Sequence, residues 1–267
     1  MKALFEYYLA LGKAAILSDI QYRVATYFYM IGMVTEPVIY LVVWSTIANA
    51  QGGQVAGYTA GAFSAYYIVW TLVRSMNIVF TPYGWEGRIR SGRLSGELMR
   101  PVHPIHSDIA FFGGMKVVWI LLWLPIAAVL YLIFRPELHP TLLEVAVFGV
   151  AIWGAFLVRT MALSILGMIT FWTTRVGALY ELYFALELVL SGRMVPMALM
   201  PEWVQRVAWF MPFQWTFFFP INALVGEMTP QELLTGLGMQ VAWIVIGALA
   251  VNIMWKAGIK RYAAVGN

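Results

Sequence analysis

Long apolar runs constrain the fold of this chain more than any other feature. A helix needs about 20 mostly apolar residues to cross a bilayer. Six stretches are candidates, at about 24–48, 60–79, 109–134, 142–172, 176–190 and 234–255, of which the fifth is short. Charged residues make up only 11% of the chain, against roughly 25% in an ordinary soluble domain. The sequence predicts an all-α, polytopic membrane protein with six transmembrane helices in a single domain, 1–267.

The distribution of Lys and Arg predicts the orientation, because cytoplasmic loops are enriched in both. Arg135, Arg193 and Arg206 would lie outside, and Arg74 and Arg159 fall within spans. Twelve others would lie inside or at the inner boundary: Lys2, Lys13, Arg23, Arg88, Arg90, Arg93, Arg100, Lys116, Arg175, Lys256, Lys260 and Arg261. We therefore expect both termini to be cytoplasmic. This explanation of the positive charge leaves little reason to expect a nucleic-acid partner.

Residues 1–23 predict an amphipathic helix rather than a span. Leu4, Tyr8, Leu11 and Ala15 recur at helical spacing, with charged residues elsewhere. Such a helix would lie on the inner surface of the membrane lipid or pack on the cytoplasmic loops of the protein itself. The segment lacks the pattern of a cleaved signal peptide.

The outer connection, 191–233, combines many prolines with many Trp, Phe and Met residues. Its five prolines exclude a continuous helix, and an irregular backbone exposed to lipid is not tolerated. We expect short re-entrant outer helices at about 201–210 and 213–225, before the last span. The aromatic and Met-rich composition would suit an amphipathic solute, and it serves equally as an ordinary membrane anchor.

Charged residues at membrane depth are costly, and they usually pair or line a pathway. The candidates are Glu36, Arg74 with Asn77 on one helix face, Arg159, Glu181 and Glu187. Glu36 with Arg74, and Arg159 with Glu187, are candidate internal ion pairs. Contact with a passing solute is the other interpretation, and a pair can do both.

Several kinds of chemistry lack their motifs. There is no G-x-x-x-x-G-K-[ST] phosphate loop, so we expect no ATP hydrolysis by this chain alone. There is no cysteine, and HPIHSD (103–108) reads as a solvated loop, so we expect no metal site and no cofactor. The intramembrane acids are scattered, which disfavours a lipid-modifying enzyme. We therefore expect no catalytic residues.

The cytoplasmic connection, 83–108, concentrates arginines and turn residues. Gly84, Gly87 and Gly92 can begin or end short helices, and two X-Pro steps, ending at Pro101 and Pro104, force an extended exit. Between them, 88–99 predicts two to three turns of amphipathic helix suited to a protein surface. A positive-inside loop would explain the arginines but not the patterned leucines and glycines.

The run from Glu86 through Gly92, Leu94, Leu98, Arg100 and Pro101 resembles the signature of permease subunits of ABC-2-type exporters. Its form, SGRLSGELMRPVHP, is similar to the G-x-L-x-x-x-L-x-R-P motif of a bacterial branch of ABC-2 permeases, and the predicted architecture resembles that family over the whole chain. The resemblance implies a bacterial inner-membrane location and a pathway shared with a second permease, identical or a sister subunit. Separate ATPase subunits would bind ATP and Mg and would push on 88–99, the coupling helix.

The resemblance also implies roles for individual residues. The ATPase-coupling residues would be Arg88, Arg90, Arg93, Leu94, Glu97, Leu98, Arg100 and Pro101, with a second contact at 173–175. Cavity candidates on the first, second and fifth spans are Glu36, Tyr40, Arg74, Asn77, Glu181 and Glu187. The main alternative is a stand-alone channel or ion-coupled carrier, with Glu36, Arg74 and Glu187 as an ion relay.

Overall fold

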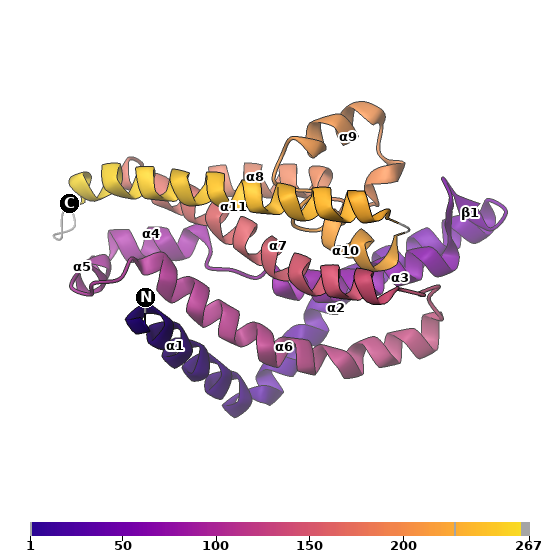
Figure 1. The fold of residues 1–267 in the computed structure, drawn as a ribbon, viewed down its shortest axis with the longest axis horizontal. Coiled ribbons are helices and arrows are strands. Elements are labelled where there is room, and N and C mark those ends of the chain that lie inside the picture. The colour runs from indigo at the N-terminus through magenta and orange to yellow at the C-terminus, as the bar shows by residue number, and fades with distance from the viewer. Residues whose placement is uncertain (1, 227, 263–267) are drawn as a thin grey trace.

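The computed structural model describes residues 2–226 and 228–262, which form an elongated helical bundle (Figure 1). The α-helices are α1 (Lys2–Gln21), α2 (Arg23–Ala50), α3 (Ala60–Met76), α4 (Pro82–Arg90), α5 (Leu94–Leu98), α6 (Pro104–Phe134), α7 (Leu142–Met168), α8 (Gly177–Leu190), α9 (Glu202–Trp209), α10 (Phe218–Val225) and α11 (Pro230–Gly258). Short 3-10 helices follow at Ile169–Phe171, Met197–Leu199 and Ile259–Arg261. An antiparallel hairpin, β1 (Gln54–Val55) and β2 (Tyr58–Thr59), joins α2 to α3.

Each of the six predicted stretches forms a helix. In the part of the chain that the structure describes, four helical stretches are long and apolar enough to cross a membrane: α2, α6, Leu142–Phe171 and Pro230–Arg261. Two are shorter, α3 with 17 residues and α8 with 14. An all-α polytopic membrane protein is therefore confirmed, and the count of six spans stays a prediction.

Helix α3 forms the centre of the bundle. It packs against α2, α6, α7 and α10, and the side chains of Phe63, Tyr66, Tyr67 and Trp70 are fully buried. Because protein surrounds this helix, its length need not match the thickness of the bilayer.

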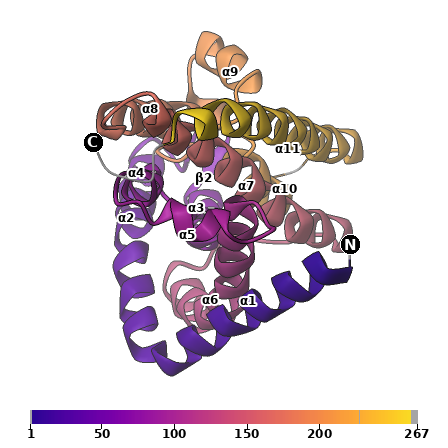
Figure 2. The same ribbon diagram turned by 90° about the vertical axis from the view of Figure 1, so that its left-hand side faces the viewer.

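The N-terminal helix α1 lies along the first half of α6, and it forms a V with α2 (Figure 2). The Tyr7 hydroxyl lies 2.6 Å from that of Ser107, and the Trp119 indole donates to Asp19 at 2.8 Å. Away from this contact, α1 exposes large apolar side chains, including Phe5, Leu9 and Leu17. Helix α1 thus packs on α6, including the first turns of α6 that belong to the predicted cytoplasmic connection, and keeps an apolar outer face.

The outer connection folds into two separate helices, as its prolines predicted. Helix α9 projects from the bundle, whereas α10 packs against α7 and α3 (Figure 1). The second helix begins at Phe218, later than the predicted 213, because 213–217 forms turns. Its Phe219, Ile221 and Ala223 are buried. Position 227 of this segment lies outside the described residues, and the depth of these helices in the membrane stays a prediction.

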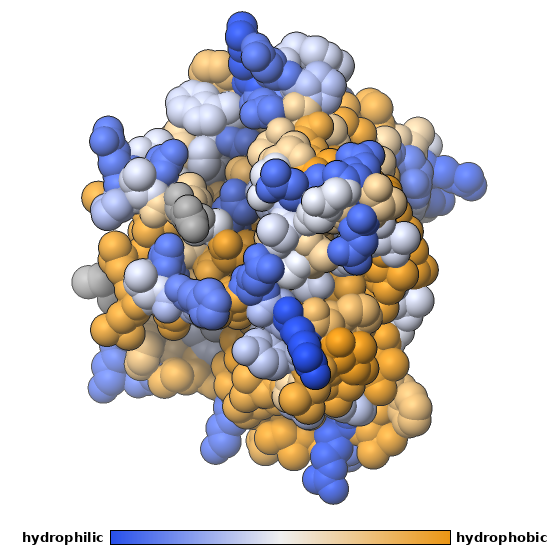
Figure 3. Space-filling view, turned by 90° about the vertical axis from the view of Figure 1, so that its right-hand side faces the viewer, coloured by the Kyte–Doolittle hydropathy of each residue, from blue (hydrophilic) through white to orange (hydrophobic). Residues whose placement is uncertain are grey.

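The two ends of the bundle are formed by different elements. Helix α1 begins and α11 ends at the same end as α4 and α5 (Figure 1), which agrees with termini on one side of a membrane. The opposite end mixes hydrophilic and hydrophobic residues, with polar residues across its middle (Figure 3).

Candidate functional site

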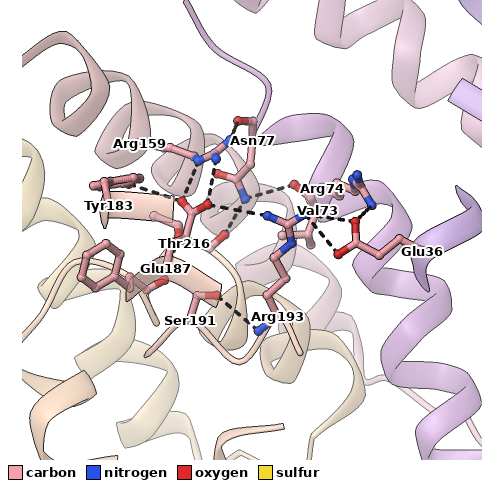
Figure 4. A network of polar contacts seen from close by, with 11 residues as sticks. Glu36, Val73, Arg74, Asn77, Arg159, Tyr183, Glu187, Ser191, Arg193 and Thr216 are labelled. Atoms are coloured by element: carbon pink, nitrogen blue, oxygen red, sulfur yellow. Dashed lines mark hydrogen bonds and ion pairs between the residues drawn. The ribbon is translucent and has the colours of Figure 1, made fainter. Parts of the chain in front are cut away.

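Both predicted ion pairs are present (Figure 4); the Arg159–Glu187 pair is buried, and the Arg74–Glu36 pair is partly exposed. Arg159 on α7 donates from Nε and Nη2 to the two carboxylate oxygens of Glu187 on α8, each at 2.8 Å. Arg74 on α3 donates from Nη1 to Oε2 of Glu36 on α2. Tyr183 Oη also donates to Glu187, at 3.3 Å. The pairing follows from physical chemistry, since a charge in the interior needs a partner of opposite sign.

Arg193, which the sequence placed on the outer side, is buried and links these two pairs. Its Nη2 lies 3.1 Å from Oε2 of Glu36, and its Nη1 lies 3.9 Å from Oε2 of Glu187. The turn that aims it inward follows the end of α8 and depends on Gly192, whose φ is +78°. The only available signal was the Ser-Gly-Arg break after a helix with two glutamates.

The linked cluster carries an excess of positive charge. The guanidinium groups of Arg74, Arg159 and Arg193 share the carboxylates of Glu36 and Glu187. Arg193 Nε is buried without a hydrogen-bond partner among the described residues. A buried donor without a partner is rare and marks a candidate ligand contact. We call these five residues the charge network.

Two cationic side chains donate hydrogen bonds to the unpaired backbone carbonyls at the carboxyl end of α3, which lies inside the protein. Lys116 Nζ donates to the carbonyl oxygens of Ser75, at 2.9 Å, and Ile78, at 2.6 Å. Arg159 donates to the backbone carbonyl of Asn77. The side-chain amide of Asn77 donates to the backbone carbonyl of Thr216 at 2.6 Å. Cations are favoured there because the last carbonyls of a helix are unpaired and carry partial negative charge.

Lys116 is therefore an interior group and not the charge at the inner boundary that the sequence suggested, because its side chain is fully buried. Without Lys116 and Arg193, the predicted count of Lys and Arg residues changes from twelve inside and three outside to eleven inside and two outside. The bias that predicts the orientation persists.

The remaining cavity candidates occupy different surroundings. The Tyr40 ring lies beside those of Tyr67 and Trp70, 6.0 Å away in each case. The rings of Trp70 and Phe217 flank the guanidinium of Arg193, with centroids at 5.8 and 6.0 Å. Glu181 is exposed near Tyr83 of α4, with 3.5 Å between their oxygens. The structure thus brings Glu36, Tyr40, Arg74, Asn77 and Glu187 together, and leaves Glu181 apart.

The segment 88–99 is not the single helix that the sequence suggested. Helix α4 ends at Arg90, and α5 begins at Leu94. Gly92 breaks them apart with a φ of +75°, a conformation that glycine adopts without steric cost. The cytoplasmic motif therefore forms a helix–turn–helix corner.

The corner buries two of the expected coupling residues. Arg88 donates to both carboxylate oxygens of Asp108, at 3.0 and 2.7 Å, and its Nε lies 3.1 Å from Glu97. The rings of Phe80 and Trp85 also flank its guanidinium, with centroids at 4.3 and 4.7 Å. Leu94 is fully buried. Both groups join the corner to α6 and to its own core, and neither faces solvent in this conformation.

An exposed surface remains on the corner. Glu97 is half-buried. The exposed residues of the corner are Arg90, Arg93, Leu98, Met99, Arg100 and Pro101. Residues 173–175 are also exposed, and the next residue, Val176, contacts Glu86 of α4. We call these exposed residues of the corner and 173–175 the basic end surface.

Glu86 joins this surface to α8. Its carboxylate accepts a hydrogen bond from the amide of Val176, at 3.1 Å, and pairs with Arg90 at 2.9 Å. The hydrogen bond from Val176 and the nearby cation hold the pKa of Glu86 below its ordinary value. The glutamate of the motif thus satisfies the amide just before α8 begins.

HPIHSD begins α6 and is not the solvated loop that the sequence suggested. His103 caps the helix through Nδ1, which accepts from the amide of Ile105, and its ring lies 4.2 Å from that of Trp255. Burial lowers the pKa of His103 to about 4. Within 2–226 and 228–262, no group of three or more His, Cys, Asp or Glu side chains could hold a metal ion.

The comparisons with known proteins give one family. The model of a family described as "ABC-2 family transporter protein" matches residues 14–266. No curated protein matches the chain. The match covers nearly the whole chain, in agreement with the helical membrane fold and with the motif at the α4–α5 corner: the chain belongs to the ABC-2 family of transporter proteins.

Proposed function

We propose that this ABC-2 permease is the membrane-spanning subunit of an ATP-driven ABC exporter. Two permeases, identical or sister chains, form the pathway, and separate ATPase subunits hold the ATP and Mg. The complex lies in the bacterial inner membrane, with both termini and the basic end surface in the cytoplasm. Family membership, the exposed basic end surface and the lack of a phosphate loop support this proposal.

The hydrogen bond between Glu86 and the amide of Val176 carries the proposal. It connects α4, which borders the basic end surface, to the start of α8. Near its other end, α8 carries Glu187, which lies at the centre of the charge network. The basic end surface and the charge network are thereby joined through one rigid helix.

The coupling mechanism follows from this connection. Closure of the ATPase subunits presses on Arg90, Arg93, Leu98 and Arg100, while the Arg88–Asp108 pair holds the corner against α6. Movement of α4 then shifts α8 and re-sorts the contacts of Glu187 with Arg159 and Arg193. Packed interfaces change between discrete arrangements rather than deform continuously, so such a shift opens or closes the pathway.

In this mechanism, the charge network lies on the pathway. Charged, polar and aromatic contacts to the solute come from Glu36, Tyr40, Arg74, Asn77 and Glu187. The exposed Glu181 lies nearer the cytoplasmic end. The unpartnered Nε of Arg193 supports such a contact, since a passing acceptor group would satisfy it.

A stand-alone ion-coupled carrier is the second candidate. The observation in its favour is that Arg193 bridges Glu36 and Glu187, two carboxylates at the predicted membrane depth, because acidic groups at that depth mark ion pathways. In a carrier, the charge network would respond to an ion gradient, and the basic end surface would need no partner.

Co-expression with an ABC ATPase from the same genome separates the two. We expect the ATPase to co-purify with the permease, and its hydrolysis rate in vesicles to change at least severalfold when the permease is present. Ion-gradient-driven transport in vesicles without any ATPase would overturn the exporter proposal and favour the carrier.

A further inference from the structure

A cavity at the side of the bundle is not used by the proposed mechanism. It has a volume of about 910 Å³, within the size range of small-molecule sites. It is lined by the 3-10 helix Met197–Leu199, helix α9, helix α10 with the turn before it, and the first turns of α11. Its walls are largely apolar and include Trp209, Phe210, Trp215, Phe218 and Phe219.

The aromatic walls are held in place by named contacts. The Trp215 indole donates to the Trp209 carbonyl at 3.3 Å, and its ring lies 5.9 Å from that of Phe219. Gln240 donates to the Trp215 carbonyl at 2.8 Å, which ties this wall to α11. Gly236 lets α11 approach α10 closely, because a Cβ there would lie 1.9 Å from the Phe219 ring. The cavity is therefore preformed.

Polar groups are present in the lining as well. Five polar residues of the lining are exposed or half-exposed: Gln205, Arg206, Gln231, Glu232 and Thr235. Gln214 is buried and also lines it. An apolar wall with polar groups of both signs beside it matches a molecule with a hydrocarbon chain and a zwitterionic headgroup.

Helix α9, which borders the cavity, has an apolar exposed face. Trp203, Val207 and Phe210 are exposed at helical spacing, and Met211 follows them. Such a stripe is typical of a helix that lies in the membrane interface. Phe210 belongs to both the stripe and the cavity lining, so a chain can pass from the surrounding leaflet into the cavity.

We propose that this cavity binds one acyl chain of a zwitterionic phospholipid from the outer leaflet. The chain lies against Trp209, Trp215 and Phe219, and the headgroup stays near Arg206 and Glu232. The lipid is a bound ligand in this proposal, so binding holds whichever solute the complex transports and whether or not an ATPase is needed.

The test uses photolabelling of the purified full-length chain with lysophosphatidylcholine that carries a diazirine in its acyl chain. We expect labelled peptides from α9, α10 and the start of α11. Thr235→Trp and Ala198→Trp fill the cavity from exposed positions and should reduce this labelling at least fivefold. Leu234→Trp is the matched control, because Leu234 is exposed and does not line the cavity; it should leave labelling unchanged.

Three outcomes would overturn the proposal. In the first, both filled variants label as strongly as the control while remaining monodisperse. In the second, label spreads evenly over α2 and α6 with none concentrated at the cavity. In the third, glycerophosphocholine, which has the headgroup without a chain, competes as well as the chain-bearing lipid does; the cavity would then be a site for polar solutes.

Discussion

Arg159 and Glu187 face each other in a two-pronged ion pair, with both nitrogen–oxygen distances at 2.8 Å. The carboxylate is fully buried, and the guanidinium side chain is about 11% exposed. Arg159 also donates to the Asn77 carbonyl. One side chain of α7 therefore ties the end of α3 to α8 in this conformation.

Removing one partner of this pair should be strongly destabilising. Glu187→Gln leaves Arg159 buried without a full countercharge, at a cost of about 3–5 kcal/mol. Thermal unfolding in detergent should show the loss as a lower Tm. Glu181→Gln is the control, because Glu181 is exposed, and the double variant Arg159→Met with Glu187→Leu should recover most of the stability. Equal Tm values for Glu187→Gln and Glu181→Gln would contradict the structural role.

Gly92 should be intolerant of a side chain. Its φ of +75° makes Gly92→Ala cost about 1–2 kcal/mol. Gly96 lies inside α5 with open space around it, so Gly96→Ala should stabilise by up to about 1 kcal/mol. Opposite shifts of Tm are the expected result, and shifts of the same sign would argue against the corner geometry.

Leu94 and Leu98 should respond differently to the same change. Leu98 is 37% exposed on the basic end surface, and Leu94 is fully buried. We expect Leu98→Asp to keep the Tm and to weaken ATPase binding about tenfold or more, as measured by co-purification and titration. Leu94→Asp should lower the Tm first, because it buries an unpaired charge. Undiminished ATPase binding by a folded Leu98→Asp variant would remove Leu98 from the interface.

Glu86 should matter for coupling more than for binding. Glu86→Ala removes the acceptor of the Val176 amide and the ion-pair partner of Arg90, but it changes no residue of the basic end surface itself. We expect the ATPase to bind the variant within about twofold of the wild-type affinity, while the permease-dependent change in hydrolysis rate falls severalfold. Glu86→Gln keeps an acceptor and should retain more of the effect. If the Glu86→Ala permease changes the hydrolysis rate of the ATPase as much as the wild type does, the proposed connection through Glu86 is wrong.

Acidification should destabilise the start of α6. The pKa of His103 falls from 6.5 to about 4 on folding because the ring is partly buried. The unfolded chain therefore binds a proton between these pH values that the folded chain excludes, so stability is complete above about pH 6.5 and falls toward pH 4. For a half-buried ring screened by solvent, the loss is on the order of 1 kcal/mol. The Tm of His103→Gln should vary less across this range, and parallel curves would refute the assignment.

Apolar runs and prolines were enough to predict the long helices and their approximate ends. The cost of an unpaired charge in an apolar interior also made Glu36–Arg74 and Arg159–Glu187 candidate pairs from the sequence alone. These features depend on local composition and on rules that hold in every bilayer, so the sequence by itself determined the class of protein and most of its elements.

Only the tertiary structure decided which side chains face which neighbours. Gly92 turned one expected helix into two, and this corner buried Arg88 and Leu94 while leaving Arg90 and Leu98 exposed. Gly192 turned Arg193 inward, and the end of α3 inside the bundle drew in Lys116. These outcomes depend on contacts between residues far apart in the chain and on single backbone angles, neither of which periodicity or charge counting specifies.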